Sequence, residues 1–240
     1  MNKKKVIIIT AIILIIIYIG YKAFNLYYFT YIYTIDEKRI MNYEKINIKT
    51  LRMISNTKYD SLHINIPNEF KYDDEISKQE KTLKIDWYIK RDKKNKDILS
   101  AITINKSAMN LDSFLKDGGV RKIDYTNVIK KNNINNCFDL LEYYKKHQNE
   151  KQTIFTPVSK MKMNHLANTF VYFNLPAYQK IYKLNGGLTG YLLESPSSKY
   201  FISYIMYKDD TYVINFNNAK EKKYFTYEKV IEILQSIYFE

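Results

Sequence analysis

The chain has 240 residues, with 38 lysines and arginines against 25 aspartates and glutamates, and a formal net charge of +13. Its single cysteine, Cys137, excludes an intramolecular disulfide, so packing alone must hold the folded part together. The sequence has no zinc-ligand spacing, glycine-rich phosphate loop or aromatic RNA-binding motif, and we therefore expect no metal, no cofactor and no nucleic-acid partner. The abundance of Lys, Ile, Asn and Tyr is typical of an AT-rich bacterial genome, which accounts for part of the charge.

The chain begins with a short basic segment, residues 1–5, followed by an uncharged apolar run from Val6 to Tyr21. A helix rises about 1.5 Å per residue and the hydrocarbon core of a bilayer is about 30 Å thick, so about twenty residues are needed to cross it. The run is slightly short, and we predict that Lys22 extends its ammonium outward while the helix continues. The sequence thus predicts a transmembrane signal anchor over residues 6–28.

The flanks of this anchor predict its orientation and its depth. Basic residues stay on the cytoplasmic side, so residues 1–5 form a cytoplasmic tail and the rest of this single-pass protein is extracytoplasmic, at the cell membrane. Tyrosines after the apolar run fit a belt at the outer membrane–water interface. The predicted anchor residues, which contact the lipid bilayer, are Lys3, Lys4, Lys5, Lys22, Tyr27, Tyr28 and Tyr31.

Two other interpretations of the apolar run are open. A cleaved signal peptide would need a small-residue cleavage site, and none is visible in the stretch 19–25. A soluble protein could instead bury the helix in its core. An uncleaved anchor is the preferred interpretation, because a run so rich in isoleucine has no polar face to present to water.

Residues 29–60 are interpreted as a membrane-proximal connector, partly helical, and residues 61–240 as one extracytoplasmic domain. The domain begins with an alternating strand that contains Leu62, Ile64 and Ile66 and ends at Pro67. Loop is expected to about residue 81. A hairpin is then predicted from a strand over 83–90, a charged tip over 91–97 and a second strand over 98–105. In its first strand, the predicted core face is made by Leu83, Ile85, Trp87 and Ile89.

The middle of the chain is predicted to be mostly helical. A short helix over 111–117 should stop at the glycine pair 118–119. Asn136 is placed to cap a helix over 137–144, and the pair Thr156-Pro157 should open another that runs to about residue 167. Residues 170–173 look extended and end at Asn174-Leu175-Pro176.

The last third of the chain predicts a strand meander and a final helix. Strands are expected over 181–184, 188–194, 200–207 and 212–216, joined by turns that include Asn185-Gly186-Gly187. Thr226 should cap the final helix, whose apolar stripe is wide enough to pack on the sheet. An antiparallel sheet with packed helices, after one N-terminal transmembrane helix, is the α+β class.

This order of elements resembles the PsbP/Mog-type fold. The resemblance rests on the strand 62–67, the following hairpin, the Gly190-Tyr191 strand, the strand 212–216 and the ending 230–239, and it covers about residues 61–240. It implies an antiparallel sheet with helices packed against it and a role in binding or assembly, with no catalytic signature.

Three functions from different classes remain open. The preferred one is a membrane-anchored, non-catalytic binding or assembly protein whose partner is an envelope or secreted protein. The second is a basic domain that binds the membrane surface or the cell wall. The third is an unrecognised envelope hydrolase, which needs His63, His147 or His165 to meet carboxylates or Cys137 in one pocket. Each of these four residues also has a structural interpretation: His63 on the outer face of a strand, His147 at a helix end, His165 on a helix and Cys137 as a buried thiol.

Overall fold

The computed structural model describes most of the chain and divides it into two compact units. The described residues are 3–31, 42–48, 57–79, 84–107, 111–116, 123–174, 180–195, 198–208, 210–218 and 224–240. One unit, the helical unit, comprises Met1–Lys38 and Leu111–Pro176, and the other, the sheet unit, comprises Arg39–Asn110 and Ala177–Glu240. The segment 111–176, which the sequence predicts as part of the domain 61–240, groups with the N-terminal helix and not with the sheet.

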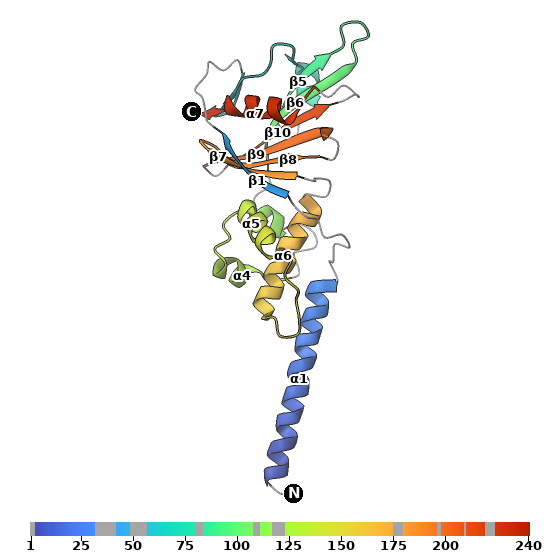
Figure 1. Cartoon of the computed structure of the whole chain (residues 1–240), viewed down its shortest axis with the longest axis vertical. Coiled ribbons are helices and arrows are strands. Elements are labelled where there is room, and N and C mark those ends of the chain that lie inside the picture. Colours follow the sequence, from blue (N-terminus) through green and yellow to red (C-terminus); the bar gives the residue numbers. More distant parts are fainter. Residues whose placement is uncertain are drawn as a thin grey trace. The chain divides into compact units, whose positions relative to one another are not determined.

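The helical unit is built around one long helix and one central helix (Figure 1). Its helices are α1 (Lys3–Tyr31), α3 (Leu111–Lys116), α4 (Thr126–Lys131), α5 (Cys137–His147) and α6 (Val158–Asn174). The predicted helix over 6–28 is confirmed as α1, which continues to Tyr31. The glycine pair 118–119 lies outside the described residues.

The helix α1 has an exposed portion, residues 6–21, which we call its bare portion, and a covered portion that begins at Lys22. Every side chain from Val6 to Tyr21 is exposed. Lys22, Asn25 and Phe29 are buried, and their spacing places them on one face of the helix. This face packs against α6, where the Phe29 and His165 rings meet edge to face at 5.6 Å between centroids. By length and composition α1 is able to cross a membrane.

One of the two helix starts predicted from capping residues in this unit follows the predicted chemistry. The side chain of Asn136 accepts hydrogen bonds from the backbone N–H groups of Phe138 and Asp139, at 2.9 and 3.0 Å, which begins α5 as predicted. The helix α6 begins at Val158, next to the predicted pair Thr156-Pro157, but the Thr156 hydroxyl accepts the Thr153 N–H and not a helix N–H. The helix also does not stop near residue 167. The extended segment predicted over 170–173 is wrong. These residues continue α6, and Phe170 and Val171 are buried there, so tertiary packing overrides their strand propensity.

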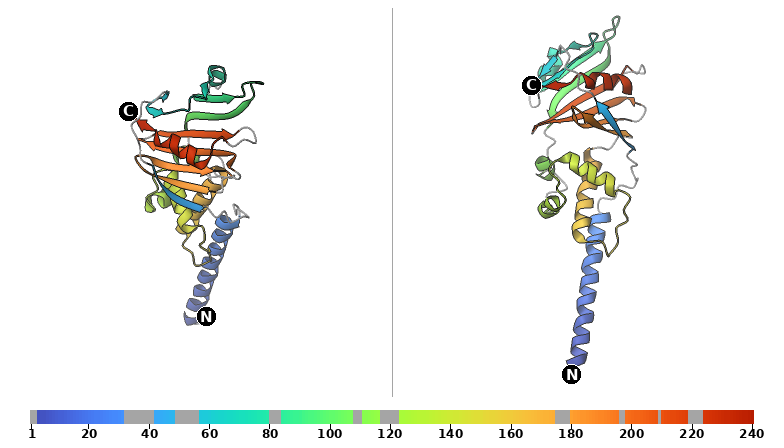
Figure 2. Two further views of the ribbon diagram at one scale, coloured as in Figure 1. Left: turned by 45° about the horizontal axis from the view of Figure 1, so that its top comes forward. Right: turned by 60° about the vertical axis from the view of Figure 1, so that its left-hand side comes forward.

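The sheet unit contains a large sheet and a small one. The strands are β1 (Asn42–Ile48), β2 (Thr57–Tyr59), β3 (Leu62–Ile64), β4 (Lys71–Tyr72), β5 (Ile85–Arg91), β6 (Ile98–Ser107), β7 (Lys180–Gly186), β8 (Thr189–Glu194), β9 (Tyr200–Tyr207), β10 (Asp210–Asn218) and β11 (Tyr238–Phe239). Eight strands pair in the order β1-β7-β8-β9-β10-β6-β5-β4, and three in the order β11-β3-β2. All pairs are antiparallel except β1 with β7 (Figure 2). The chain as a whole combines mainly antiparallel sheets with packed helices, so the predicted α+β class is confirmed.

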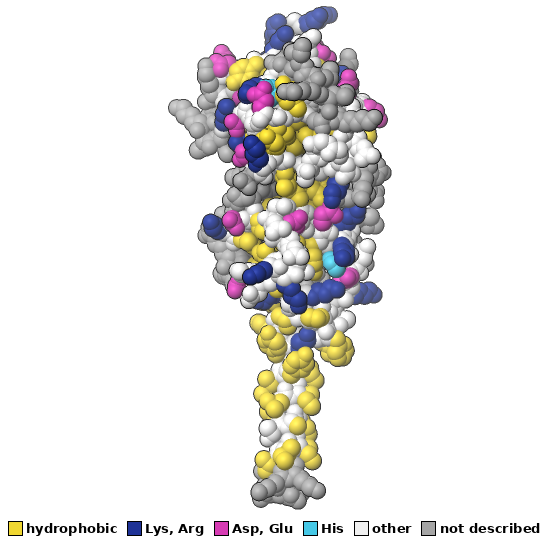
Figure 3. Space-filling view, turned by 90° about the vertical axis from the view of Figure 1, so that its left-hand side faces the viewer, with side chains coloured by type: hydrophobic (Ala, Val, Ile, Leu, Met, Phe, Trp, Pro, Cys, Tyr) yellow, Lys and Arg dark blue, Asp and Glu magenta, His cyan; other side chains and the backbone are white. Residues whose placement is uncertain are grey.

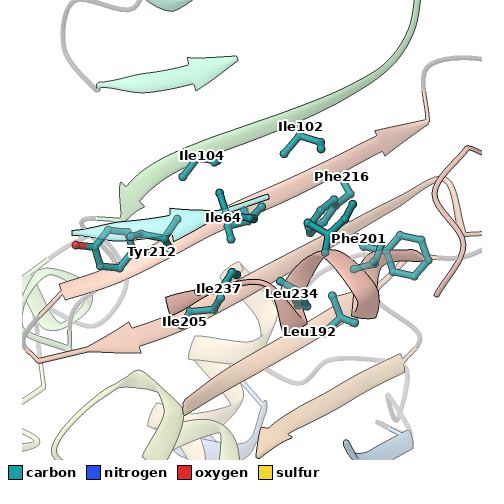
Figure 4. Close-up of a cluster of buried hydrophobic side chains, with 14 of the residues drawn as sticks. Ile64, Ile102, Ile104, Leu192, Phe201, Ile205, Tyr212, Phe216, Leu234 and Ile237 are labelled. Carbon is teal, nitrogen blue, oxygen red and sulfur yellow. The ribbon is translucent and has the colours of Figure 1, made fainter. Parts of the chain in front are cut away.

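The core of the sheet unit lies between the large sheet, the small sheet and α7 (Tyr227–Gln235). Figure 4 shows Leu234 and Ile237 beside Leu192 and Ile205 of the large sheet, and Ile64 of β3 near Ile104. Phe201 and Phe216 are fully buried in the same cluster. Thr226 caps α7 by accepting the Lys229 N–H, so the predicted final helix is confirmed.

The strand β5 has buried side chains on both faces: Ile89 of the predicted core face is 3% exposed, and Tyr88 of the opposite face is also buried. Tyr88 belongs to the core cluster, and its register partner is Ile102 of β6, whose side chain points to the same side. Ile85 and Trp87 lie on the other side, where α2 (Asp74–Gln79) contacts the strand and the Ser77 hydroxyl accepts the Trp87 N–H. Leu83 is outside the described residues. The predicted face is thus partly confirmed, and the sequence missed that Tyr88 on the opposite face packs in the core cluster.

Several short or distant elements depart from the sequence prediction. The connector predicted over 29–60 holds two strands in its described part, β1 and β2. The segment 68–81, predicted as loop, contains β4 and α2, and the end of the chain adds β11. In contrast, the hairpin β5–β6 and the meander from β7 to β10 lie where the alternation and the turn residues place them.

Candidate functional site

The sheet unit has a groove between α7 and the segment that follows β3. We call it the α7 groove, and it has a volume of about 400 Å³. This size falls within the range of small-ligand and peptide sites. Its lining residues are Asn65, Ile66, Pro67, Asn68, Glu69, Tyr224, Lys229, Glu232, Ile233 and Ser236.

The floor of the α7 groove combines two isoleucines with a serine and is fixed by hydrogen bonds. Ile66 and Ile233 are buried, as is Ser236. The Ser236 hydroxyl accepts the backbone N–H of Asn65 at 2.9 Å and donates to the carbonyl of Ile233 at 2.7 Å. The hydroxyl thus ties the segment after β3 to the end of α7, so both walls of the groove are held in place.

The rim of the α7 groove carries charge of both signs around one tyrosine. The Tyr224 hydroxyl donates to Oε1 of Glu69, and the ammonium of Lys90 lies 3.7 Å from the same oxygen. The ammonium groups of Lys229 and Lys90 lie 3.6 and 3.9 Å from the centre of the Tyr224 ring, within cation–π range. Asn218 holds Tyr224 in position because its side-chain oxygen accepts the Tyr224 N–H at 3.0 Å.

The protonation of these groups follows from their contacts. The hydrogen bond from Tyr224, with smaller contributions from the nearby Lys90 and Lys229, lowers the pKa of Glu69. Burial, and then the Glu69 carboxylate, raise the pKa of Tyr224. At neutral pH the rim therefore presents a carboxylate, a neutral phenol and two ammonium groups. A floor of mixed polarity inside such a rim suits non-covalent binding of a segment that has an apolar side chain and polar neighbours.

The histidines considered for a hydrolase lie in separate surroundings. In the sheet unit, His63 is buried, in contrast to the predicted outer face, and it stacks on Tyr238 with its Nε2 3.1 Å from Oε2 of Glu240. His147, at the end of α5 as predicted, has its Nδ1 2.9 Å from Oε1 of Glu150.

His165 and Cys137 are both buried inside the helical unit. His165 lies on α6, as predicted, with its Nδ1 2.5 Å from the Tyr125 hydroxyl, and burial lowers its pKa to about 4. Cys137 is the buried thiol that the sequence predicts, and burial raises its pKa to about 12. Within the described residues, no group of three or more His, Cys, Asp or Glu side chains is arranged to hold a metal ion.

The predicted anchor residues are distributed along α1. Lys3, Lys4 and Lys5 begin the helix and Tyr31 ends it, and their side chains lie outside the described part of the structure. Tyr27 is exposed, and Tyr28 stacks on Phe24 with 6.0 Å between ring centroids. Lys22 has a partner within the protein: its ammonium donates to the carbonyl of Thr156 at 2.5 Å.

The α7 groove was not predicted from the sequence. Its rim joins Glu69 to Tyr224, which are 155 residues apart, and no motif marks either of them. The only local signal is Pro67 at the end of a strand, which indicates a turn but no binding site. The groove forms only when the segment after β3 packs against α7, and the sequence alone does not show this contact.

Comparisons with known proteins give the chain no family. No protein-family model, curated protein or solved structure matches it. The resemblance to the PsbP/Mog-type fold therefore stays a prediction, and the function has to be argued from the two units themselves.

Proposed function

We propose that this chain is a single-pass, membrane-anchored binding protein that is not an enzyme. The helix α1 holds it in the cell membrane with its N-terminus in the cytoplasm, and the sheet unit presents the α7 groove to an envelope or secreted protein. The observation that carries the proposal is the bare portion of α1: all side chains from Val6 to Tyr21 are exposed, over a length of about 24 Å. So long an exposed apolar helix is stable in a bilayer but not in water.

The α7 groove supports the binding part of the proposal. Binding hot spots combine a buried apolar contact with aromatic and basic residues around it, and the groove has Ile233 in its floor and Tyr224 between two lysines at its rim. An extended segment with an apolar side chain for the floor and an acidic residue for Lys229 fits this arrangement.

Topology is the first property to test. A periplasmic-type reporter, active only outside the cytoplasm, is fused after Glu240 in the full chain, and a cytoplasm-active reporter is fused at the same point as the control. We expect activity from the first fusion and none from the second. The reverse pattern would overturn the orientation, and loss of both fusions from the membrane fraction on carbonate washing would overturn the anchor.

Binding at the groove is tested by site-specific cross-linking in cells. A photo-reactive residue replaces Glu232, which is exposed at the groove, and Lys96, which is exposed at the tip of the β5–β6 hairpin, serves as the matched position. We expect a discrete cross-linked protein from position 232 that the additional change Lys229→Glu removes. Equal products from both positions would contradict binding at the groove.

A further inference from the structure

A loop of the helical unit ends in two exposed apolar side chains. Phe155 is 86% exposed and Ile154 is 37% exposed, in the segment 151–157 that precedes α6. Among the described large hydrophobic residues Phe155 is the most exposed, above even Ile7 of α1 at 67%. An aromatic ring in water is unfavourable, so a ring held this far out indicates a surface that contacts something apolar.

The loop holds this conformation through its own hydrogen bonds. The backbone N–H of Thr156 donates to the carbonyl of Thr153, and the N–H of Thr153 donates to the Thr156 hydroxyl, each at 2.9 Å. The Phe155 N–H donates to the Thr153 hydroxyl at 3.2 Å. The chain thus forms a closed turn that presents Ile154 and Phe155 at its tip.

The turn lies at the point where α1 changes from bare to covered. Lys22, the first buried residue of α1, donates its ammonium to the carbonyl of Thr156, the residue after Phe155. From there α1 and α6 run side by side in the same direction, since Phe29 meets His165 further along both helices. The tip is therefore level with the end of the bare stretch, about 24 Å along the helix from Val6.

Basic side chains flank the apolar tip. Lys151 precedes Ile154 by three residues and is exposed, and Lys160 follows in the first turns of α6, where it pairs with Glu150. Figure 3 shows hydrophobic and lysine or arginine side chains together at the end of the helical unit from which the bare part of α1 extends. Apolar residues with adjacent lysines fit the boundary between acyl chains and anionic headgroups.

We propose that the turn carrying Ile154 and Phe155 inserts into the outer leaflet, next to α1, as a second membrane contact. The inference rests on the proposed function, since it requires α1 to span the bilayer. It commits to phospholipid as the occupant because the tip continues the apolar surface of α1 at the depth where that surface ends. A protein anchored by one helix alone can rotate about the helix axis, and the second contact would fix how the helical unit stands on the membrane.

The test uses the full chain in vesicles of phosphatidylcholine and phosphatidylglycerol, with single cysteines labelled by an environment-sensitive fluorophore. The three positions are Phe155→Cys for the tip, Leu14→Cys for the anchor and Asn127→Cys as the control. Asn127 is exposed on α4, two residues after Tyr125, whose hydroxyl is hydrogen-bonded to His165. Because His165 lies further along α6 than the turn, Asn127 is a control position away from the tip. The native Cys137 stays unlabelled because it is buried and its pKa is about 12.

Nitroxide-labelled lipids then report contact with the bilayer. We expect a blue shift and strong quenching at position 155 by nitroxides near the headgroups, strong quenching at position 14 by nitroxides deep in the acyl chains, and neither effect at position 127. Quenching at 14 with none at 155 would overturn the second contact and leave the anchor intact. A blue shift at 155 without quenching would mean a protein contact, such as a second copy, and would also overturn it. Absence of quenching at 14 would overturn the anchor and the inference together.

A second variant pair checks that the effect belongs to the apolar tip. The double change Ile154→Ser with Phe155→Ser removes it without touching the core, because both side chains are exposed. With a fluorophore at Lys151→Cys, we expect quenching by headgroup nitroxides in the parent and its loss in the double variant. Unchanged quenching would show that the lysines alone hold the loop near the membrane, which would overturn insertion.

Discussion

The two units place similar apolar residues in opposite surroundings. In the sheet unit, Phe201, Phe216, Ile102 and Ile104 are completely buried in one cluster. In the helical unit, the longest apolar run of the chain is exposed from Val6 to Tyr21. The hydrophobic effect favours removing apolar surface from water. In the sheet unit this surface is buried inside the protein, and in the helical unit we propose that it is buried in lipid. The stability of the sheet unit should therefore respond to its apolar residues, and the anchoring of the chain to those of α1.

The largest expected effect contrasts Phe216→Ala with Ile13→Ala. Phe216 is 0% exposed, and its truncation leaves a cavity, so we expect the free energy of unfolding of the sheet unit to fall by about 3–5 kcal/mol. Ile13 is 51% exposed and should leave that value unchanged. The measurement is urea unfolding of the full chain in detergent, followed by the fluorescence of Trp87, the only tryptophan and a residue of the sheet unit. Comparable losses from the two changes would break the contrast between the units.

Acid should destabilise the helical unit through one buried histidine. The pKa of His165 is about 4 in the folded chain, because burial disfavours the imidazolium, against about 6.5 when unfolded. Between these values the unfolded state binds more protons, so the stabilising contribution is complete above pH 6.5 and is lost as the pH falls toward 4. The loss should reach about 3 kcal/mol, at roughly 1.4 kcal/mol per pH unit.

Hydrogen exchange of α6 as a function of pH measures this loss. In the variant His165→Asn, which cannot titrate, the protection of α6 should no longer fall between pH 6.5 and 4. Trp87 fluorescence should report no matching transition in the sheet unit of either protein. A slope that persists in His165→Asn would assign the acid sensitivity to another group.

Two glycines give a matched backbone test of the units. A methyl group at Gly190 in β8 would lie 2.0 Å from the carbonyl oxygen of Tyr204 in β9, whereas at Gly20 in α1 it would meet nothing within 4 Å. We expect Gly190→Ala to destabilise the sheet unit by about 1–3 kcal/mol, since the strands must separate. Gly20→Ala should instead favour the helix, by up to about 1 kcal/mol. Thermal unfolding detected by Trp87 fluorescence and by circular dichroism separates the two, and a stable Gly190→Ala sheet would contradict the close approach.

The parts of the fold that the sequence predicted depend on local patterns. Alternation and the Asn185-Gly186-Gly187 turn identify the strands from β7 to β10, and the capping residues identify the starts of α5 and α7. The elements that were missed depend on distant partners. Within the described residues, the strand β1 pairs with β7 alone, from the last third of the chain, and its own residues do not alternate strongly enough to indicate a strand.

The same division holds for the sites. The bare helix was predictable because its signal is a continuous run of apolar residues. The α7 groove and the turn that carries Ile154 and Phe155 were not, because they join residues 155 and 134 positions apart, Glu69 to Tyr224 and Lys22 to Thr156. For Phe155, a weak local signal existed: Ile154 and Phe155 are the only apolar pair in the polar stretch 145–157. Such a pair becomes informative once its exposure is known.

The smallest expected effect compares the helix caps of the two units. Asn136 accepts two backbone N–H groups at 2.9 and 3.0 Å, whereas Thr226 accepts one, from Lys229, at 3.4 Å. We expect Asn136→Ala to destabilise the helical unit by about 1–2 kcal/mol and Thr226→Ala to destabilise the sheet unit by about 0.5 kcal/mol. Hydrogen exchange of the first turns of α5 and α7 measures each loss separately, with Asn136→Asp and Thr226→Ser as controls that keep an oxygen acceptor. A larger loss from Thr226→Ala would mean that the start of α7 depends more on the cap than on packing against the sheet. The burial of Val230 and Leu234 would then contribute less to stability than their complete exclusion from water implies.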